Sequence, residues 1–176
     1  MKLARILTSA HLSAVLLLGT IMIAADAGAD GQDDRSGTQT AATDDRLNAL
    51  IRHRQATMKR IGEHMRAVIA FAKGGPGSFD QIVVYASEIK AIADQMPQMF
   101  PQGSGMGDPL DIKTGAKPEI WADWDRFMEH AEMLSAEASK LKDVAASRDK
   151  SSLKRQFMIL GRDGCSGCHE MYREKI

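Results

Sequence analysis

Apolar residues recur at helical spacings in a long segment that begins near residue 44 and ends at the sequence KGGPGS. Its apolar positions are separated mostly by three, four or seven residues: Leu47, Leu50, Ile51, Met58, Ile61, Met65, Val68, Ile69 and Ala72. Because this spacing places side chains on one face of an α-helix, it predicts an amphipathic helix that starts at Thr43 or Asp44 and ends at about Lys73.

Three further segments show the same period. Ser78 opens a second predicted helix, which ends near the sequence MFP, and Pro118 suits the first position of a third. A fourth begins near Arg148 or Asp149 and continues into the last residues. No stretch alternates apolar and polar residues with a period of two over a useful length. The pattern therefore predicts an all-α fold, an antiparallel four-helix bundle formed by residues 44–176.

Two polar segments interrupt or precede this pattern. Residues 30–43, DGQDDRSGTQTAAT, show no apolar period and are rich in Gly, Ser, Thr and Asp, so they predict a flexible polar tether. Residues 101–117, PQGSGMGDPLDIKTGAK, predict a long loop. A loop of that length in a compact domain usually covers or binds something.

The first residues are typical of a secretory signal. Lys2 and Arg5 give a positive start, residues 14–25 are apolar, and residues 27–29 are small enough for cleavage. The 12 residues of the apolar run are fewer than the roughly 20 that a membrane-spanning helix needs, so we expect no stable membrane insertion. We therefore predict a signal peptide over residues 1–29, cleavage after it, and export to the periplasm.

Composition narrows the range of functions. The formal net charge is zero and no block of basic residues stands out, so nucleic-acid binding has no electrostatic support. Aromatic residues make up only 5% of the chain, which is little for a core of this size. Either aliphatic side chains and methionine fill the interior, or a bound group that is not an amino acid helps to fill it.

The only two cysteines lie in the sequence CSGCH, at Cys165 and Cys168, and His169 follows directly. Two thiols three positions apart can add to the two vinyl groups of one haem, and the adjacent imidazole can bind the iron. The pattern C-x-x-C-H is typical of covalent attachment of c-type haem.

The motif has three other interpretations. A thioredoxin-like dithiol needs a strand before the motif, and none is predicted. A structural zinc site needs four ligands, and no second cysteine or histidine pair has a suitable spacing. A short-range disulfide suits an exported protein but leaves the histidine unexplained.

The chain resembles the class II c-type cytochromes, the family of cytochrome c′ and its low-spin relatives. The resemblance covers about residues 44–176. It depends on Arg54-Gln55 with Met58 shortly after, on KPEIW at residues 117–121, and on CSGCHEMYR at residues 165–173. It implies a four-helix bundle that binds one haem c through Cys165 and Cys168, with His169 as an iron ligand.

The resemblance also implies roles for three residues of the first helix. Arg54 would lie near a haem propionate and Gln55 in the haem surroundings, whereas Met58 would face the iron from the side opposite His169. A thioether bound to the iron gives a six-coordinate, low-spin haem suited to electron transfer. A methionine that only covers this face leaves a five-coordinate haem that binds nitric oxide or carbon monoxide. The simpler alternatives are a solvated helix arginine at 54 and a core methionine at 58.

The remaining candidates have simpler expected roles. Arg173 is expected near the His169 side of the haem or on the surface, and Tyr172 is expected to pack. His53, His64 and His130 are expected at the surface or at the rim of the site. Most other methionines are expected to fill the core: Met65, Met96, Met99, Met128, Met133 and Met158.

The sequence therefore predicts a periplasmic monohaem cytochrome that exchanges single electrons with periplasmic redox partner proteins. Such a protein transforms no substrate and is not an enzyme. The alternatives are a binder of nitric oxide or carbon monoxide and a dithiol oxidoreductase without haem. The resemblance also allows a homodimer, which an exposed apolar strip on the first two helices would suit.

Overall fold

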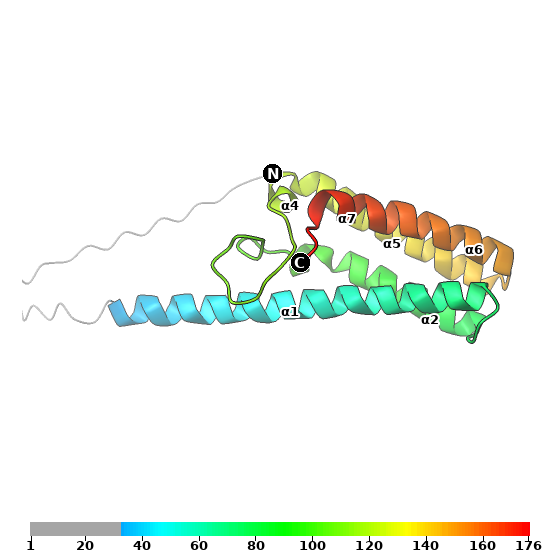
Figure 1. The fold of residues 1–176 in the computed structure, drawn as a ribbon, viewed down its shortest axis with the longest axis horizontal. Helices are drawn as coiled ribbons and strands as arrows, with labels where there is room; N and C mark the ends of the chain where they lie inside the picture. Colours follow the sequence, from blue (N-terminus) through cyan, green and yellow to red (C-terminus); the bar gives the residue numbers. More distant parts are fainter. Residues whose placement is uncertain (1–32) are drawn as a thin grey trace, which may run out of the picture.

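The computed structural model describes residues 33–176, so the predicted signal peptide lies outside the described part of the chain. The described residues form an antiparallel four-helix bundle, as the sequence predicts (Figure 1). The chain runs along α1, returns along α2 and crosses a long loop into α5. It then returns along the fourth helix, which consists of α6, η1 and α7. The elements are α1 (Asp33–Ala72), α2 (Phe79–Asp94), α3 (Met96–Met99), α4 (Glu119–Ala122), α5 (Trp124–Ala146), α6 (Lys150–Ile159), the π-helical segment η1 (Leu160–Ser166) and α7 (Gly167–Tyr172).

The start of α1 differs from the prediction. Residues 33–43, which belong to the predicted flexible polar tether, are helical and form the start of α1, and the helix extends past the loop of residues 101–117 (Figure 1). Thr43 does not cap a helix but donates a hydrogen bond from Oγ1 to the carbonyl of Gln39, 3.0 Å away and one turn earlier. Extending a helix that is already formed costs far less than nucleating one, which explains why a polar segment without an apolar face continues the helix.

The predicted N-termini of the second and fourth helices are confirmed. Ser78 caps α2, and its Oγ accepts a hydrogen bond from the Gln81 amide. Asp149 caps α6 by accepting from the Ser151 amide at 2.9 Å. The third predicted helix is divided, because the backbone of Asp123 leaves the helical region between α4 and α5.

The core consists mainly of aliphatic side chains from all four long helices. The largest fully buried apolar side chains are Ile51, Ile82, Ile89, Ile120, Leu141, Leu153, Leu160 and Val68. Two of the methionines expected in the core are instead on the surface: Met133 is 45% exposed and Met158 is 61% exposed. Met133 precedes the buried Leu134, and Met158 follows the half-buried Phe157, so the spacing of apolar residues alone does not distinguish these two positions from core positions.

The expected apolar strip on the first two helices is small. Among the described residues of α1 and α2, Val84 is the one large apolar side chain that is mainly exposed, at 53%. None of the helices in residues 33–176 combines the length and apolar composition that a membrane crossing requires.

The loop between α3 and α4 joins α1 to the C-terminus. The Glu174 amide donates to the Gly115 carbonyl at 2.8 Å, and the Lys117 amide donates to the Tyr172 carbonyl at 3.0 Å. On its other side, the Ile112 amide donates to Oδ1 of the buried Asn48 on α1. The loop therefore covers one end of the bundle, next to the end of the fourth helix.

Candidate haem-binding site

A cavity of about 630 Å³ opens between α1, α5 and the fourth helix, at the end of the bundle that the loop covers. Pockets that bind small molecules and cofactors usually measure roughly 300–1,000 Å³ and are mainly apolar. The apolar lining comes from α1, α3, the loop after it, α4 and α5: Met58, Ile61, Met65, Met96, Phe100, Ala116, Ile120, Phe127, Ala131 and Leu134. This cavity accounts for the low aromatic content of the sequence, because protein side chains leave part of the interior unfilled.

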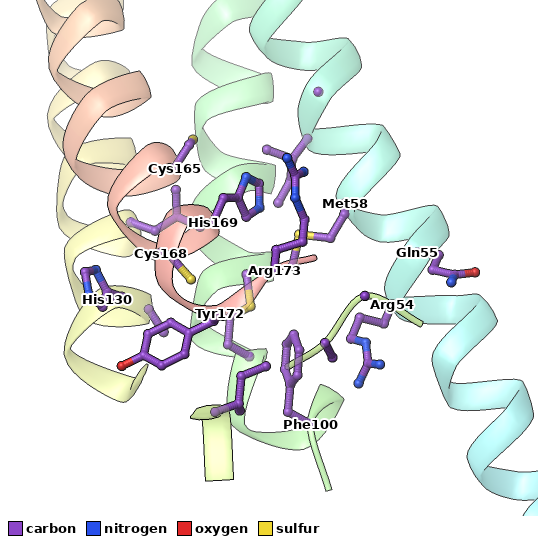
Figure 2. A pocket seen from close by; sticks show the side chains of 18 of the residues that line it. Arg54, Gln55, Met58, Phe100, His130, Cys165, Cys168, His169, Tyr172 and Arg173 are labelled. Carbon is purple, nitrogen blue, oxygen red and sulfur yellow. The ribbon is translucent and has the colours of Figure 1, made fainter. Parts of the chain in front are cut away.

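Cys165, Cys168 and His169 all line this cavity, where the fourth helix changes from the π-helical segment to α7 (Figure 2). Both thiols are free, so they form no disulfide with each other. Burial raises the pKa of Cys165, and burial together with the neighbouring Cys165 raises the pKa of Cys168 to about 11. Reactive dithiols have lowered thiol pKa values. The environment of these cysteines therefore disfavours the dithiol oxidoreductase.

His169 is half-buried, and it projects from α7 into the cavity (Figure 2). Burial lowers its pKa, and the nearby positive charge of Arg173 lowers it further. The imidazole is consequently neutral at pH 7, which is the form that binds metals. Within residues 33–176 no cluster of three or more His, Cys, Asp or Glu side chains is arranged for a metal ion.

Met58 lies on the opposite side of the cavity from His169. It projects from α1, and its sulfur is directed into the space between α1 and α7 (Figure 2). Met65, two turns further along α1, also lines the cavity, as does Met96. The structure thus brings a thioether and an imidazole to the same cavity from residues far apart in the sequence.

Arg54 is buried at the edge of the cavity, with only 3% of its surface exposed. Its guanidinium donates four hydrogen bonds to residues after α2: to the carbonyls of Met99 (3.1 Å) and Ser104 (2.8 Å), and to the hydroxyls of Ser104 (3.1 Å) and Thr114 (2.8 Å). It also lies over the ring of Phe100, 4.5 Å from the centroid. The sequence indicated a propionate partner, and it gave no sign that Arg54 also holds the loop against α1.

The charge of Arg54 has no balancing carboxylate in the described part of the chain, where none of the ion pairs includes it. Burial lowers its pKa to about 10, so it remains charged at pH 7. A buried charge without an opposite charge is costly. A carboxylate of a bound cofactor would supply that opposite charge, so this residue fits a haem propionate at the cavity edge.

Gln55 lies beside the cavity but is exposed, and its side chain is directed away from His169 (Figure 2). Its Nε2 donates to the Lys113 carbonyl at 2.8 Å. Its observed role is to hold the loop, and its place in the haem surroundings stays a prediction.

Sequence reasoning did not place His130 or Tyr172 in the cavity lining, although the expectation that Tyr172 packs is confirmed. His130, expected to have no more than a rim position, is half-buried and lines the cavity. The ring of Tyr172 packs edge-on against Phe127 at 5.4 Å and against His130 at 5.8 Å. The Tyr172 hydroxyl is buried, bonds no group of the described residues, and has a pKa raised by burial. The sequence offered one signal for His130. It lies three residues after Phe127 and one before Ala131, so it is next to the apolar face of its helix.

The other expected positions are mostly confirmed. His53 is exposed. His64 lies outside the cavity, bonding Glu88 at 2.7 Å and stacking on Tyr85 at 4.5 Å. Arg173 follows the end of α7 and lines the cavity with an exposed side chain.

Comparison with known proteins places this arrangement in a family. The family model described as cytochrome c′ matches residues 49–173. Cytochrome c′ from Pararhodospirillum photometricum is 34% identical over 128 residues, which cover 72% of this chain and 97% of that protein. Cytochrome c-556 from Agrobacterium tumefaciens is 32% identical over 126 residues, covering 71% of this chain and 97% of the relative.

Solved structures show the same fold. A cytochrome c′ with an unusual ligand-controlled dimer dissociation matches with a TM-score of 0.65 and 30% identity, over 73% of this chain and 97% of its own. Cytochrome c′ from Thermochromatium tepidum matches with a TM-score of 0.64 and 27% identity, over the same fractions. The nitric oxide complex of the L16I mutant from Alcaligenes xylosoxidans matches with a TM-score of 0.62 and 25% identity, again over 73% and 97%.

Proposed function

The chain belongs to the cytochrome c′ family, whose members bind one covalent haem c, and on this premise we propose that it carries single electrons in the periplasm. Cys165 and Cys168 hold the haem as thioethers, and His169 binds the iron from α7. The predicted signal peptide over residues 1–29 directs export, and the mature protein exchanges electrons with other periplasmic proteins. It transforms no substrate.

The bound haem supplies one-electron chemistry between Fe(III) and Fe(II). The protein supplies the surroundings. Arg54 provides a fixed positive charge for a propionate, and the apolar lining from α1 and α5 keeps water away from the cofactor. His169 is already in the neutral form that a metal ligand requires.

The observation that carries the proposal is the direction of the Met58 sulfur. It enters the cavity from α1, on the side opposite α7 and His169 (Figure 2). A thioether bound opposite an imidazole gives a low-spin haem with a raised reduction potential, the combination found in electron-carrying cytochromes c. Met58 would therefore hold the haem iron together with His169.

A second candidate function is the binding of nitric oxide or carbon monoxide. Its support is the Alcaligenes xylosoxidans relative, which is solved as a nitric oxide complex. In this alternative Met58 covers an open face of the haem without binding it. Methionine is flexible enough to move aside for a small ligand.

One set of spectra separates these functions. The electron carrier predicts a low-spin ferric haem with a methionine–iron charge-transfer band, and a ferrous form that does not bind carbon monoxide. Met58→Ala is expected to abolish this band and convert the haem to high spin. Met65→Ala is the matched control, because Met65 lines the same cavity from the same helix, and it should leave the ferric spectrum unchanged. A wild-type ferric spectrum that is high-spin, and the same in Met58→Ala, would favour the gas binder.

A further inference from the structure

Four cations form a row along α1 and the residue that follows its end. Arg52, Lys59, Arg66 and Lys73 follow one another at intervals of seven residues, and all four side chains are exposed. Seven residues are almost two helical turns, so the four side chains lie along one side of the helix, each about 10.5 Å from the next. We call these four residues the cationic row.

The middle of the row borders the haem cavity. Lys59 and Arg66 both line it, and the Arg66 guanidinium extends back along α1 to within 3.6 Å of the position a Cβ would take on Gly62. Arg173 adds a third exposed cation to the same lining, from the C-terminal segment. Three of the exposed residues that line the cavity are therefore cations, and the other exposed ones are Gln55, Glu174 and Ile176.

Little negative charge opposes them. Glu63 lies beside the row on α1, and Glu174 is the one acidic side chain among the residues that line the cavity, which also include the C-terminal Ile176. In the described part of the chain, none of the ion pairs includes Lys59, Arg66 or Arg173. The protein as a whole has equal numbers of acidic and basic residues, 23 of each, so this local excess is an asymmetry of the surface.

An unpaired row of charges on a helix is usually only a solvated face. Here it coincides with the opening of the cofactor site, where a redox partner must approach. Complementary charge at such a place raises the rate of productive encounter by roughly 10- to 1,000-fold and orients the partner.

We infer that the cationic row and Arg173 form the docking surface for a redox partner protein with an acidic surface around its own redox centre. This inference rests on the proposed electron transfer and names the class of partner. The acidic patch would lie over Lys59 and Arg66, with the cofactors of the two proteins facing each other. One electron would pass between them, oxidising one centre and reducing the other.

Stopped-flow kinetics with an acidic plant-type [2Fe–2S] ferredoxin tests the inference. The reduced ferredoxin gives one electron to the ferric haem, and the bimolecular rate constant is measured against salt concentration. For the wild-type holoprotein we expect a rate that falls steeply as salt rises. Lys59→Glu and Arg66→Glu should each lower the low-salt rate about 10-fold. Lys154→Glu makes the same charge change at an exposed position of α6 outside the cavity lining, and should alter the rate less than about 2-fold.

Equilibrium redox titration and the visible spectrum of each variant separate a docking effect from a change in the haem. We expect the visible spectra to match the wild type. Replacing a cation of the cavity lining by Glu is expected to lower the reduction potential, so the rates are compared after correction for the driving force measured for each variant. A rate that is independent of salt, or that falls equally in Lys154→Glu, would overturn the docking surface while leaving electron transfer intact. If the wild-type ferric spectrum is instead high-spin and unchanged in Met58→Ala, the proposed electron transfer fails. The salt dependence of the bimolecular rate constant then still decides whether an acidic protein docks at this surface.

Discussion

Asp149 holds the start of the fourth helix through its side chain. Its carboxylate accepts hydrogen bonds from the Ser152 hydroxyl and from the hydroxyl and amide of Ser151, and these bonds lower its pKa to about 2. A lowered carboxyl pKa stabilises the folded state above the ordinary pKa of 3.8, and this stabilisation is lost as the pH falls towards 2. The cap should therefore act fully at neutral pH.

We expect Asp149→Ala to lower the thermal unfolding midpoint at pH 7, and the difference from wild type to shrink between about pH 4 and pH 2. Asp149→Asn is the control, because an Asn oxygen also caps helices but does not titrate. Its difference from Asp149→Ala should not depend on pH. A wild-type advantage over Asp149→Ala that persists unchanged at pH 2 would show that the carboxylate charge is not involved.

The individual residues of the site were predictable to different extents. Cys165, Cys168 and His169 were identified because their chemistry is contained in five adjacent positions. The contacts of Arg54 could not be predicted, because its partners lie 45 to 60 residues away, at the end of α3 and in the loop without periodic pattern that follows it. The same holds for His130, whose place in the cavity depends on how α5 packs against the fourth helix.

At the scale of elements, the fourth helix contains a feature that the sequence did not reveal. Seven residues, Leu160–Ser166, are wound as a π-helix immediately before α7. Such segments are rare and often occur at functional sites. The sequence predicts an uninterrupted α-helix here. Over seven residues, an apolar spacing of three or four residues is compatible with an α-helix and with a π-helix alike.

Gly164 explains how the π-helical segment approaches α5. A Cβ at this position would lie 3.0 Å from Leu160 Cδ1, 3.2 Å from Leu134 Cδ1 and 3.3 Å from Leu134 Cα. The last atom belongs to the backbone of α5, so it cannot move aside as a side chain does. Glycine therefore permits the close packing that sets the position of the adjacent Cys165.

Gly164→Ala is expected to destabilise the holoprotein by about 1–3 kcal/mol, the usual cost of overpacking, as measured by denaturant unfolding. Gly37→Ala on α1 is the matched control, because an added methyl there meets no atom within 4 Å. It should be neutral or slightly stabilising, since alanine favours helices over glycine. Equal stability of Gly164→Ala and wild type would contradict the close packing of this segment against α5.

At the scale of the whole molecule, the bundle was predictable because four amphipathic periods and no alternating pattern leave few other folds. The boundary at residue 44 was not predictable. Residues 33–43 carry no apolar face, and their helical state follows from the helix behind them and not from their own pattern. The cavity was foreseen only as a shortage of aromatic side chains. Its walls depend on packing among α1, α5 and the fourth helix.

The central claim is that one haem is bound covalently to the fourth helix within this cavity. Intact-mass measurement of protein purified from the periplasm of a host with a c-type maturation system tests it most directly. We predict the mass of the polypeptide that follows residue 29 plus one haem, and no haem adduct in the Cys165→Ser/Cys168→Ser variant. A wild-type mass equal to that of the polypeptide alone would contradict the account.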